Sequence, residues 1–189
     1  KSLLFFKDKD LWQRITTVLR LDEGDQIILF DDVINLVVEL DQQIRLSKNI
    51  VSGVVVASQE NKKYDLALTL YAPLTKKEAF ESLIYSAAQL GVSVIQPFVS
   101  SKIHRMWWHD REYQRCQKIM IAACEQAKQF IVPKLEKPIG FDSVKALADK
   151  NIFFEAGVDS VKVLISEMTS KKYQHVTLLF GPEGGLSDA

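Results

Sequence analysis

The spacing of apolar residues divides the chain into two stretches. The first carries short apolar runs separated by polar turns, at residues 26–30, 33–40, 43–46, 50–57 and 66–71. In the last run, Leu66, Leu68 and Leu70 alternate with smaller residues, which is the period of a strand. A helical pattern at 10–20 precedes them. Five short strands in the first 72 residues predict a small β-barrel.

The period changes after Ala72-Pro73. Apolar residues recur every three or four positions in 75–90 and 110–130, which predicts two amphipathic helices. Weaker helical patterns occupy 142–149 and 160–167, and apolar runs at 92–98, 151–157 and 176–180 predict buried strands. Helices that alternate with buried strands predict a mostly parallel α/β sheet. We therefore predict a β-barrel domain at 1–72 and an α/β domain at 73–189.

The composition restricts the classes of partner. The chain has 24 basic and 24 acidic residues, so any binding of nucleic acid must come from local basic patches. No apolar run reaches about 18 residues, and we expect no membrane partner. The three histidines lack metal-ligand spacing, so we expect no metal.

The cysteines indicate the compartment. Cys116 and Cys124 lie eight residues apart in one predicted helix, where they cannot bridge each other without breaking it. There is no disulfide framework and no Cys-x-x-Cys. We therefore expect a reducing, cytoplasmic setting.

A glycine turn follows the last apolar run. Val176–Phe180 is succeeded by Gly181, Pro182, Glu183, Gly184 and Gly185. Three glycines without a Cβ let a ligand touch the backbone directly, as in small-ligand sites at strand ends. The same residues would equally make a tight strand-to-helix turn without a ligand. Glu155 ends another predicted strand and could meet Gly181 at one rim, as a base or as a solvated strand end.

The densest mixture of charged and aromatic residues lies at 100–118. Its basic members include Lys102, Arg105, Arg111 and Arg115, and Trp107-Trp108 lies among them. Arginine and lysine pair with phosphates, and indole faces stack on unpaired bases. The alternative is a loop whose tryptophans anchor it to the core, with a solvated helix face behind it.

Four motifs in order resemble the ribosomal RNA small subunit methyltransferase E family. The most specific is Leu178-Leu-Phe-Gly-Pro-Glu-Gly-Gly185. Val18-Leu-Arg-Leu-x-x-Gly-Asp25 resembles the family's N-terminal barrel, and Leu90-Gly-Val-x-x-Ile-x-Pro97 the start of its catalytic domain. Lys118-Ile-x-x-Ala-Ala-x-Glu-Gln126 resembles its long helix. The resemblance covers nearly the whole chain.

The resemblance implies a PUA-like β-barrel followed by a SPOUT-type α/β domain with a trefoil knot. It also implies a homodimer that uses S-adenosylmethionine to methylate uridine N3 in small-subunit (16S) ribosomal RNA. The family's cofactor-binding role falls here on Gly181, Pro182, Glu183, Gly184 and Gly185, with Phe154 and Glu155 at the rim. Candidates to guide RNA are Arg14, Arg20, Lys102, Arg105, Arg111 and Arg115.

The chain departs from the family pattern in places. Asp32 stands where a glycine is usual, and Lys102 where an arginine is usual. The family continues past the glycine loop with a second cofactor segment, so we expect the C-terminal part of the domain to be missing after Ala189. Two hypotheses stay open: an RNA methyltransferase, or a non-enzymatic RNA-binding or ribosome-assembly protein on the same scaffold.

Overall fold

The computed structural model describes residues 2–100, 107–145, 148–154 and 161–181. Contacts divide the chain into an N-terminal unit, Lys1–Lys62, and a C-terminal unit, Lys63–Ala189. Among the described residues, no helix is long and apolar enough to cross a membrane.

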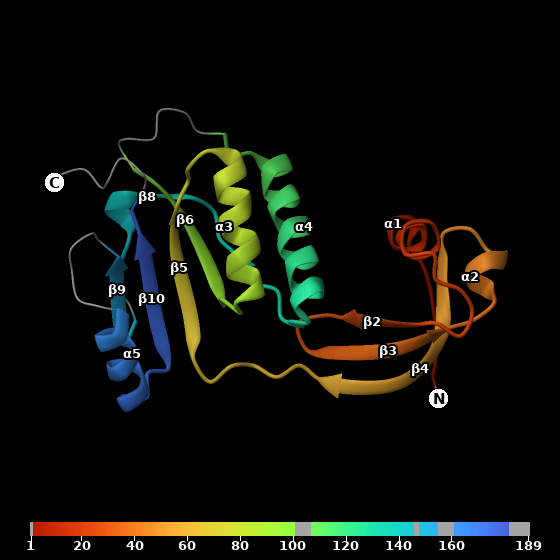
Figure 1. Ribbon diagram of the computed structural model, residues 1–189. Helices are drawn as coiled ribbons and strands as arrows, with labels where there is room; N and C mark the ends of the chain where they lie inside the picture. The colour runs from red at the N-terminus through yellow and green to blue at the C-terminus, as the bar shows by residue number, and fades with distance from the viewer. Residues whose placement is uncertain (1, 101–106, 146–147, 155–160, 182–189) are drawn as a thin grey trace. The chain divides into compact units, whose positions relative to one another are not determined.

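The N-terminal unit is built on a four-stranded antiparallel sheet (Figure 1). The strand order is β1-β4-β3-β2. Its elements are β1 (Ser2–Lys7), α1 (Lys9–Gln13), the π-helical turn η1 (Arg14–Val18), β2 (Gln26–Phe30), β3 (Ile34–Leu40), α2 (Gln43–Leu46) and β4 (Ile50–Glu60). Strands β2 and β3 form a hairpin, and in its turn the Asp31 carboxylate accepts from the amides of Val33 and Ile34.

The core of this unit lies between the sheet and its short helices. Ile15, Leu40, Ile44 and Val51 are buried together there. The Trp12 indole packs against them and donates to the Ile44 carbonyl oxygen at 2.8 Å. This bond ties α1 to α2.

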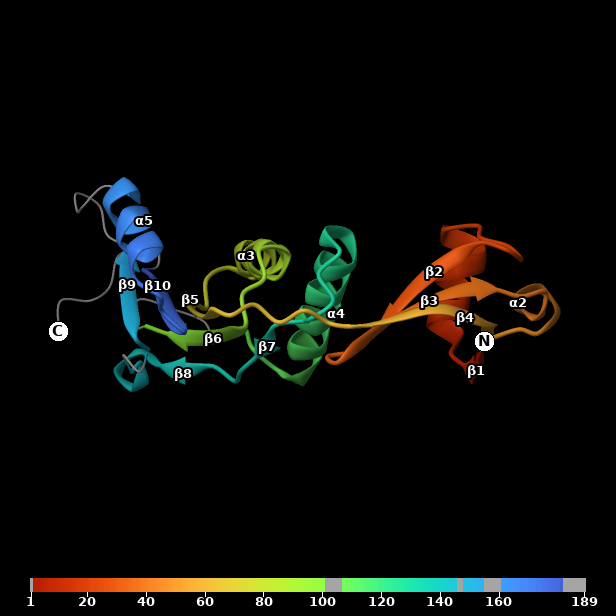
Figure 2. The same ribbon diagram turned by 90° about the horizontal axis from the view of Figure 1, so that it is seen from below.

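The C-terminal unit contains a six-stranded parallel sheet, as the alternating pattern predicted (Figure 2). Its order is β7-β6-β5-β10-β9, and β8 also pairs with β6. The elements are β5 (Ala67–Pro73), α3 (Lys77–Gln89), β6 (Val94–Val99), α4 (Asp110–Ala127), β7 (Lys134–Leu135), β8 (Ile139–Gly140), the 3-10 turn η2 (Phe141–Ser143), β9 (Lys150–Phe154), α5 (Val161–Ser170) and β10 (His175–Phe180).

Helices α3 and α4 pack side by side (Figure 1). Phe80 and Ile84 of α3 and Met120 and Ala123 of α4 are almost fully buried. At the far end of the pair, Gln89 donates to the side-chain oxygen of Gln126, so the two helices are also joined by a polar contact. Apolar burial supplies the packing energy, and the exposed amide pair adds a contact at the surface of the two helices.

One predicted strand belongs to the other domain, and another is a helix. The strand at 66–71 belongs to the parallel sheet, where β5 pairs with β6 and β10, so the boundary lies after Lys62 instead of after Ala72. Residues 43–46 form α2, because the Asp41 carboxylate accepts from the Gln43 amide and starts a helical turn. The fourth strand of the N-terminal sheet is β1, which the apolar pattern did not single out.

Two helix predictions also need correction. The helix predicted at 10–20 is α1 followed by the π-helical turn η1, with Asp8 as its N-cap. The helix predicted at 142–149 is a single 3-10 turn in its described part, because Val144 returns to an extended conformation.

Candidate functional site

The carboxyl ends of the parallel strands bring several predicted residues to one edge. β9 and β10 run in register, with Phe154 opposite Phe180. The two rings stack with centroids 4.6 Å apart and planes 1° apart, and Phe154 remains 39% exposed. Gly181 follows directly. The edge therefore presents a flat, partly open aromatic surface beside the start of the glycine turn, suited to a planar ligand.

A buried hydroxyl lies at the same edge of the sheet. Ser100 directly follows β6, is 4% exposed, and its Oγ makes no hydrogen bond within the described parts of the chain. A buried hydroxyl without a partner costs free energy unless a ligand or water satisfies it. Sequence reasoning did not assign Ser100 a role, because burial without a partner leaves no signal in a single sequence.

The remaining members of the predicted cofactor site lie outside the described residues. These are Glu155, Pro182, Glu183, Gly184 and Gly185. The pairing of β9 with β10 brings Phe154 next to Phe180, and so brings together the two strand ends that lead to Glu155 and Gly181.

The predicted RNA-contacting residues fall into two groups. Arg111 and Arg115 are exposed on α4, where they line a shallow groove with Lys77, Glu112 and Lys118. Arg14 and Arg20 are exposed in the N-terminal unit, and Arg20 has a left-handed backbone with φ 56°. Lys102 and Arg105 lie outside the described residues.

The two arginines of α4 differ in their partners. Arg115 forms a bidentate ion pair with Glu81 of α3, and this pair holds the pKa of the Glu81 carboxyl below its usual value. Arg111 makes no ion pair with any described residue. Its guanidinium is therefore the more available of the two for a phosphate.

The tryptophans of the 100–118 segment anchor the chain to the core, as one of the two interpretations predicted. The Trp107 indole donates to the Thr75 carbonyl oxygen at 2.7 Å. Both indoles contact the buried Phe80 ring with centroids 5.8 Å away. Both indoles are therefore fixed in place by protein contacts, and the exposed cations of α4 are the described basic side chains of this segment that can meet RNA.

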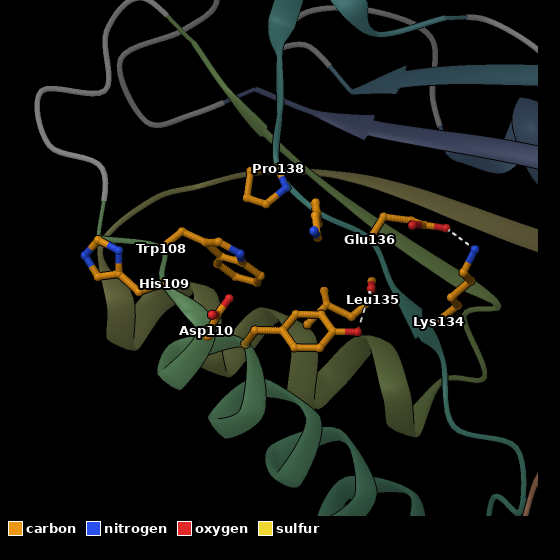
Figure 3. Close-up of a pocket in the computed structure, with 9 residues that line it drawn as sticks. Trp108, His109, Asp110, Lys134, Leu135, Glu136 and Pro138 are labelled. Atoms are coloured by element: carbon orange, nitrogen blue, oxygen red, sulfur yellow. Dashed lines mark hydrogen bonds and ion pairs between the residues drawn. The ribbon is translucent and has the colours of Figure 1, made fainter.

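A pocket of about 770 Å³ opens beside the N-terminus of α4 (Figure 3). Trp108, His109, Asp110 and Tyr113 line it from the helix side, and residues 134–138 line it from the edge of the sheet. Sequence reasoning singled out part of the helix side but not residues 134–138, because their approach depends on the pairing of β7 and β8 with β6. Within the described residues, no group of three histidine, cysteine or carboxylate side chains is arranged to hold a metal.

Comparisons with known proteins agree with this architecture. A family model described as an RNA methyltransferase domain matches residues 62–189. A ribosomal RNA small subunit methyltransferase E of Mesomycoplasma hyopneumoniae (strain 232) is 26% identical over 145 residues, 74% of this chain and 60% of the relative. The chain thus matches less than two thirds of that relative's length.

Two further relatives cover almost the whole chain. The protein of the same name from Bacillus subtilis (strain 168) is 26% identical over 191 residues, 93% of this chain and 72% of the relative. A Legionella pneumophila structure in complex with the bound cofactor SAM aligns with a TM-score of 0.78 at 25% identity, over 99% of this chain and 77% of that one. Since the family model covers more than half of the chain, the chain belongs to the RNA methyltransferase family, alongside ribosomal RNA small subunit methyltransferase E.

Proposed function

We propose that the protein transfers a methyl group from S-adenosylmethionine to N3 of a uridine in small-subunit (16S) ribosomal RNA. The observation that carries the proposal is the family match over residues 62–189, which ends in the glycine turn after β10. The relatives named above supply the substrate class and the cofactor.

The described part of the strand edge fits the proposed cofactor. An adenine ring can lie against the open face of Phe154, and the unpartnered Ser100 hydroxyl is available to a polar group of the ligand. Gly181, Pro182, Glu183, Gly184 and Gly185 would hold the cofactor through their backbone, with Glu155 at the rim. S-adenosylmethionine supplies the methyl group on a positively charged sulfur.

Catalysis of this methyl transfer depends mainly on how the enzyme positions the donor and the acceptor. The methyl moves from sulfur to N3 in line, the sulfonium becomes a neutral thioether, and N3 loses its proton. Because N3 lies on the pairing edge of uracil, the base must be unpaired or flipped before it reacts. A nearby cation stabilises the negative charge that develops on the uracil carbonyl oxygens. In this chain, arginines are the residues suited to that role.

RNA guidance is proposed for the cations of both units. Arg14 and Arg20 would act from the N-terminal unit, for which we propose the PUA-like barrel. Lys102, Arg105, Arg111 and Arg115 would act from the C-terminal unit, for which we propose the SPOUT-type knot and the homodimer. Of the described α4 arginines, Arg111 needs no rearrangement to meet a phosphate. We expect Arg111→Ala to weaken RNA binding without lowering the free energy of unfolding.

Calorimetric titration of the full-length protein with S-adenosylmethionine tests the cofactor. We expect binding in the wild type and its loss in Gly184→Val, because a side chain there would occupy cofactor space. Retained affinity in the variant would refute the assignment of the glycine turn. Absence of binding by the wild type at millimolar ligand would favour a non-enzymatic RNA-binding protein.

Methylation itself is read on the ribosomal RNA. We expect nuclease digestion and mass spectrometry to reveal N3-methyluridine after incubation of the RNA with protein and cofactor. A methyl group on any other base, or on ribose, would contradict the proposed target atom.

A further inference from the structure

The pocket beside α4 is separate from the part of the proposed cofactor edge that Phe154 and Gly181 form. Residues 134–138 belong to the β7 and β8 side of the sheet, while Gly181 follows β10. β6 and β5 lie between these two sides in the sheet. A volume of about 770 Å³ is within the range of pockets for small organic molecules.

The aromatic wall of the pocket is held in place before any ligand arrives. Trp108 and Tyr113 meet with ring centroids 6.2 Å apart at 71°, and Phe80 supports the indole edge-on. The Tyr113 hydroxyl donates to the Leu135 carbonyl oxygen at 3.4 Å and accepts from Gln117 at 3.2 Å. Because neighbours restrain both rings, a planar ligand would lose little free energy in ordering them.

Two polar groups at the pocket make no hydrogen bond or ion pair with any described residue. The indole N–H groups of Trp12 and Trp107 donate to carbonyl oxygens at 2.8 and 2.7 Å, but that of Trp108 has no such acceptor and lies on the cavity side of its ring (Figure 3). The Asp110 carboxylate at the start of α4 also lines the cavity (Figure 3). By contrast, the Glu136 carboxylate already pairs with Lys134.

The balance of charge argues against an anionic group inside the pocket. Two lysines and two carboxylates line the pocket, and one lysine is already paired. A site that binds phosphate needs a local excess of cations. An aromatic wall with one free carboxylate and one free N–H instead suits a neutral heterocycle that carries donors and an acceptor.

We propose that this pocket binds an unpaired guanine base of the substrate RNA, an inference that rests on the proposed RNA function. Guanine has two adjacent N–H donors, N1–H and the N2 amino group, which match the two oxygens of the Asp110 carboxylate. Its O6 accepts from an N–H donor such as the Trp108 indole. Unpaired bases in single-stranded RNA are commonly held against aromatic side chains in this way.

Nuclear magnetic resonance on the full-length protein tests whether the pocket binds guanine. The indole N–H groups of Trp12, Trp107 and Trp108 can each be followed in a nitrogen–proton spectrum. We expect GMP to shift the Trp108 signal and to leave those of Trp12 and Trp107 in place. IMP, which lacks the N2 amino group, should bind at least about fivefold more weakly than GMP.

The carboxylate is tested by Asp110→Asn. We expect this variant to lose at least about fivefold in GMP affinity. Glu112→Gln is the matched control, because it removes the same charge from the same turn of α4 but lies outside the pocket and pairs with Lys77 at 3.5 Å. GMP affinity should not fall in the control. An equal loss in both variants would overturn the role of Asp110.

A pair of single-stranded RNAs tests the source of the base. One contains a single guanosine and the other inosine at the same position, and we expect the guanosine RNA to bind at least about fivefold more tightly. A Trp108 shift with GMP but no discrimination between the RNAs would overturn RNA as the source. A shift with arginine amide and none with GMP would assign the pocket to a basic protein partner and overturn the proposal.

The cofactor titration separates this proposal from the proposed function. A protein that binds S-adenosylmethionine and methylates ribosomal RNA, but does not distinguish guanosine from inosine, keeps the function and refutes the guanine pocket. A protein that binds GMP through Trp108 and Asp110 but never binds cofactor refutes the methyltransferase proposal alone.

Discussion

Arg115 of α4 and Glu81 of α3 form a bidentate ion pair on the surface that the two helices share. The Arg115 Nε lies 2.6 Å from Glu81 Oε1, and its Nη2 lies 3.0 Å from Oε2. Exposed pairs of this kind contribute about 0.2–1 kcal/mol to stability. The pair's larger effect is on the groove beside it, since Glu81 neutralises one of the groove's cations.

Glu81→Gln should therefore strengthen RNA binding. The variant releases the Arg115 guanidinium, which gives the groove one more cation for a phosphate. We expect the plot of log affinity against log salt to become steeper by about 0.7, the value for one added contact to single-stranded RNA. Fluorescence anisotropy over a series of KCl concentrations measures this slope.

Glu60→Gln is the control for the change in net charge. It removes the same charge from the exposed end of β4, in the N-terminal unit. Its slope should match the wild type. If the two variants change the slope equally, Arg115 gains no phosphate contact and the effect is one of overall charge.

Glu167 should make the stability of the C-terminal unit sensitive to acid. Its carboxylate accepts from Lys150 at 2.7 Å, Tyr173 at 2.8 Å and Lys171 at 3.2 Å, and these bonds lower its pKa from 4.5 to about 2. A lowered folded-state pKa means that the contribution is complete above pH 4.5 and is lost as the pH falls toward 2.

Thermal unfolding of the wild type and Glu167→Gln across that window measures the effect. We expect the wild type to be the more stable protein at pH 7, and the difference in Tm to shrink between pH 4.5 and 2. A difference that stays constant over this range would show that the three bonds add no pH-dependent stability.

Gly91→Ala should destabilise the C-terminal unit. Gly91 follows α3 with φ +77°, a left-handed conformation that costs residues with a Cβ about 1–2 kcal/mol. An added Cβ would also lie 2.8 Å from Cε2 of Tyr64. Chemical denaturation should show a fall of that order in the free energy of unfolding.

Gly140→Ala provides the comparison. Gly140 has φ −67° and ψ 149°, which alanine adopts without strain, and an added Cβ would meet nothing within 4 Å. We expect no loss of stability there. Equal losses at both positions would exclude the left-handed backbone at Gly91 as the cause.

The two thiols should be inert in the folded protein. Cys116 and Cys124 are buried on α4, and burial raises the pKa of each to about 11. At pH 8, about one thiol in a thousand would be the reactive thiolate even with full access. A disulfide reagent should modify neither thiol in buffer and both in urea. Rapid modification of native protein would contradict this packing.

Local patterns predicted the C-terminal unit well because its elements are long and strongly periodic. The stretch at 110–127 carries small and apolar residues at helical spacing, and α4 begins and ends within a few residues of the prediction. The run at 176–180 formed β10.

Non-local partners explain the main errors. The alternation in 66–71 marks a strand but does not specify its neighbours, and those neighbours include residues 175–179, far along the chain. Residues 43–46 are too few for their own periodicity to decide between strand and helix. The Asp41 carboxylate, which accepts from Gln43 and from the Ser52 hydroxyl, favours the helix.

The site was predictable in part, for a related reason. Glu155 and Gly181 could be matched from the sequence because each follows a predicted strand, and the two strands, β9 and β10, do run side by side. The partner of Arg115 and the empty hydrogen-bonding capacity of Ser100 arise only when α3, α4 and β6 pack together. Such features depend on three-dimensional neighbours that no local pattern encodes.

The position of β10 between β5 and β9 has a consequence for synthesis. Thr69 and His175, which join β5 to β10, are 106 residues apart in sequence. As the ribosome makes the chain, β5, β6 and β9 emerge first, and β5 and β9 each keep an unpaired edge until β10 arrives between them. Strands that are so far apart in the sequence pair slowly, and strand edges that are still unpaired can pair with other chains. The nascent protein is therefore most exposed to aggregation just before residues 175–180 leave the ribosome.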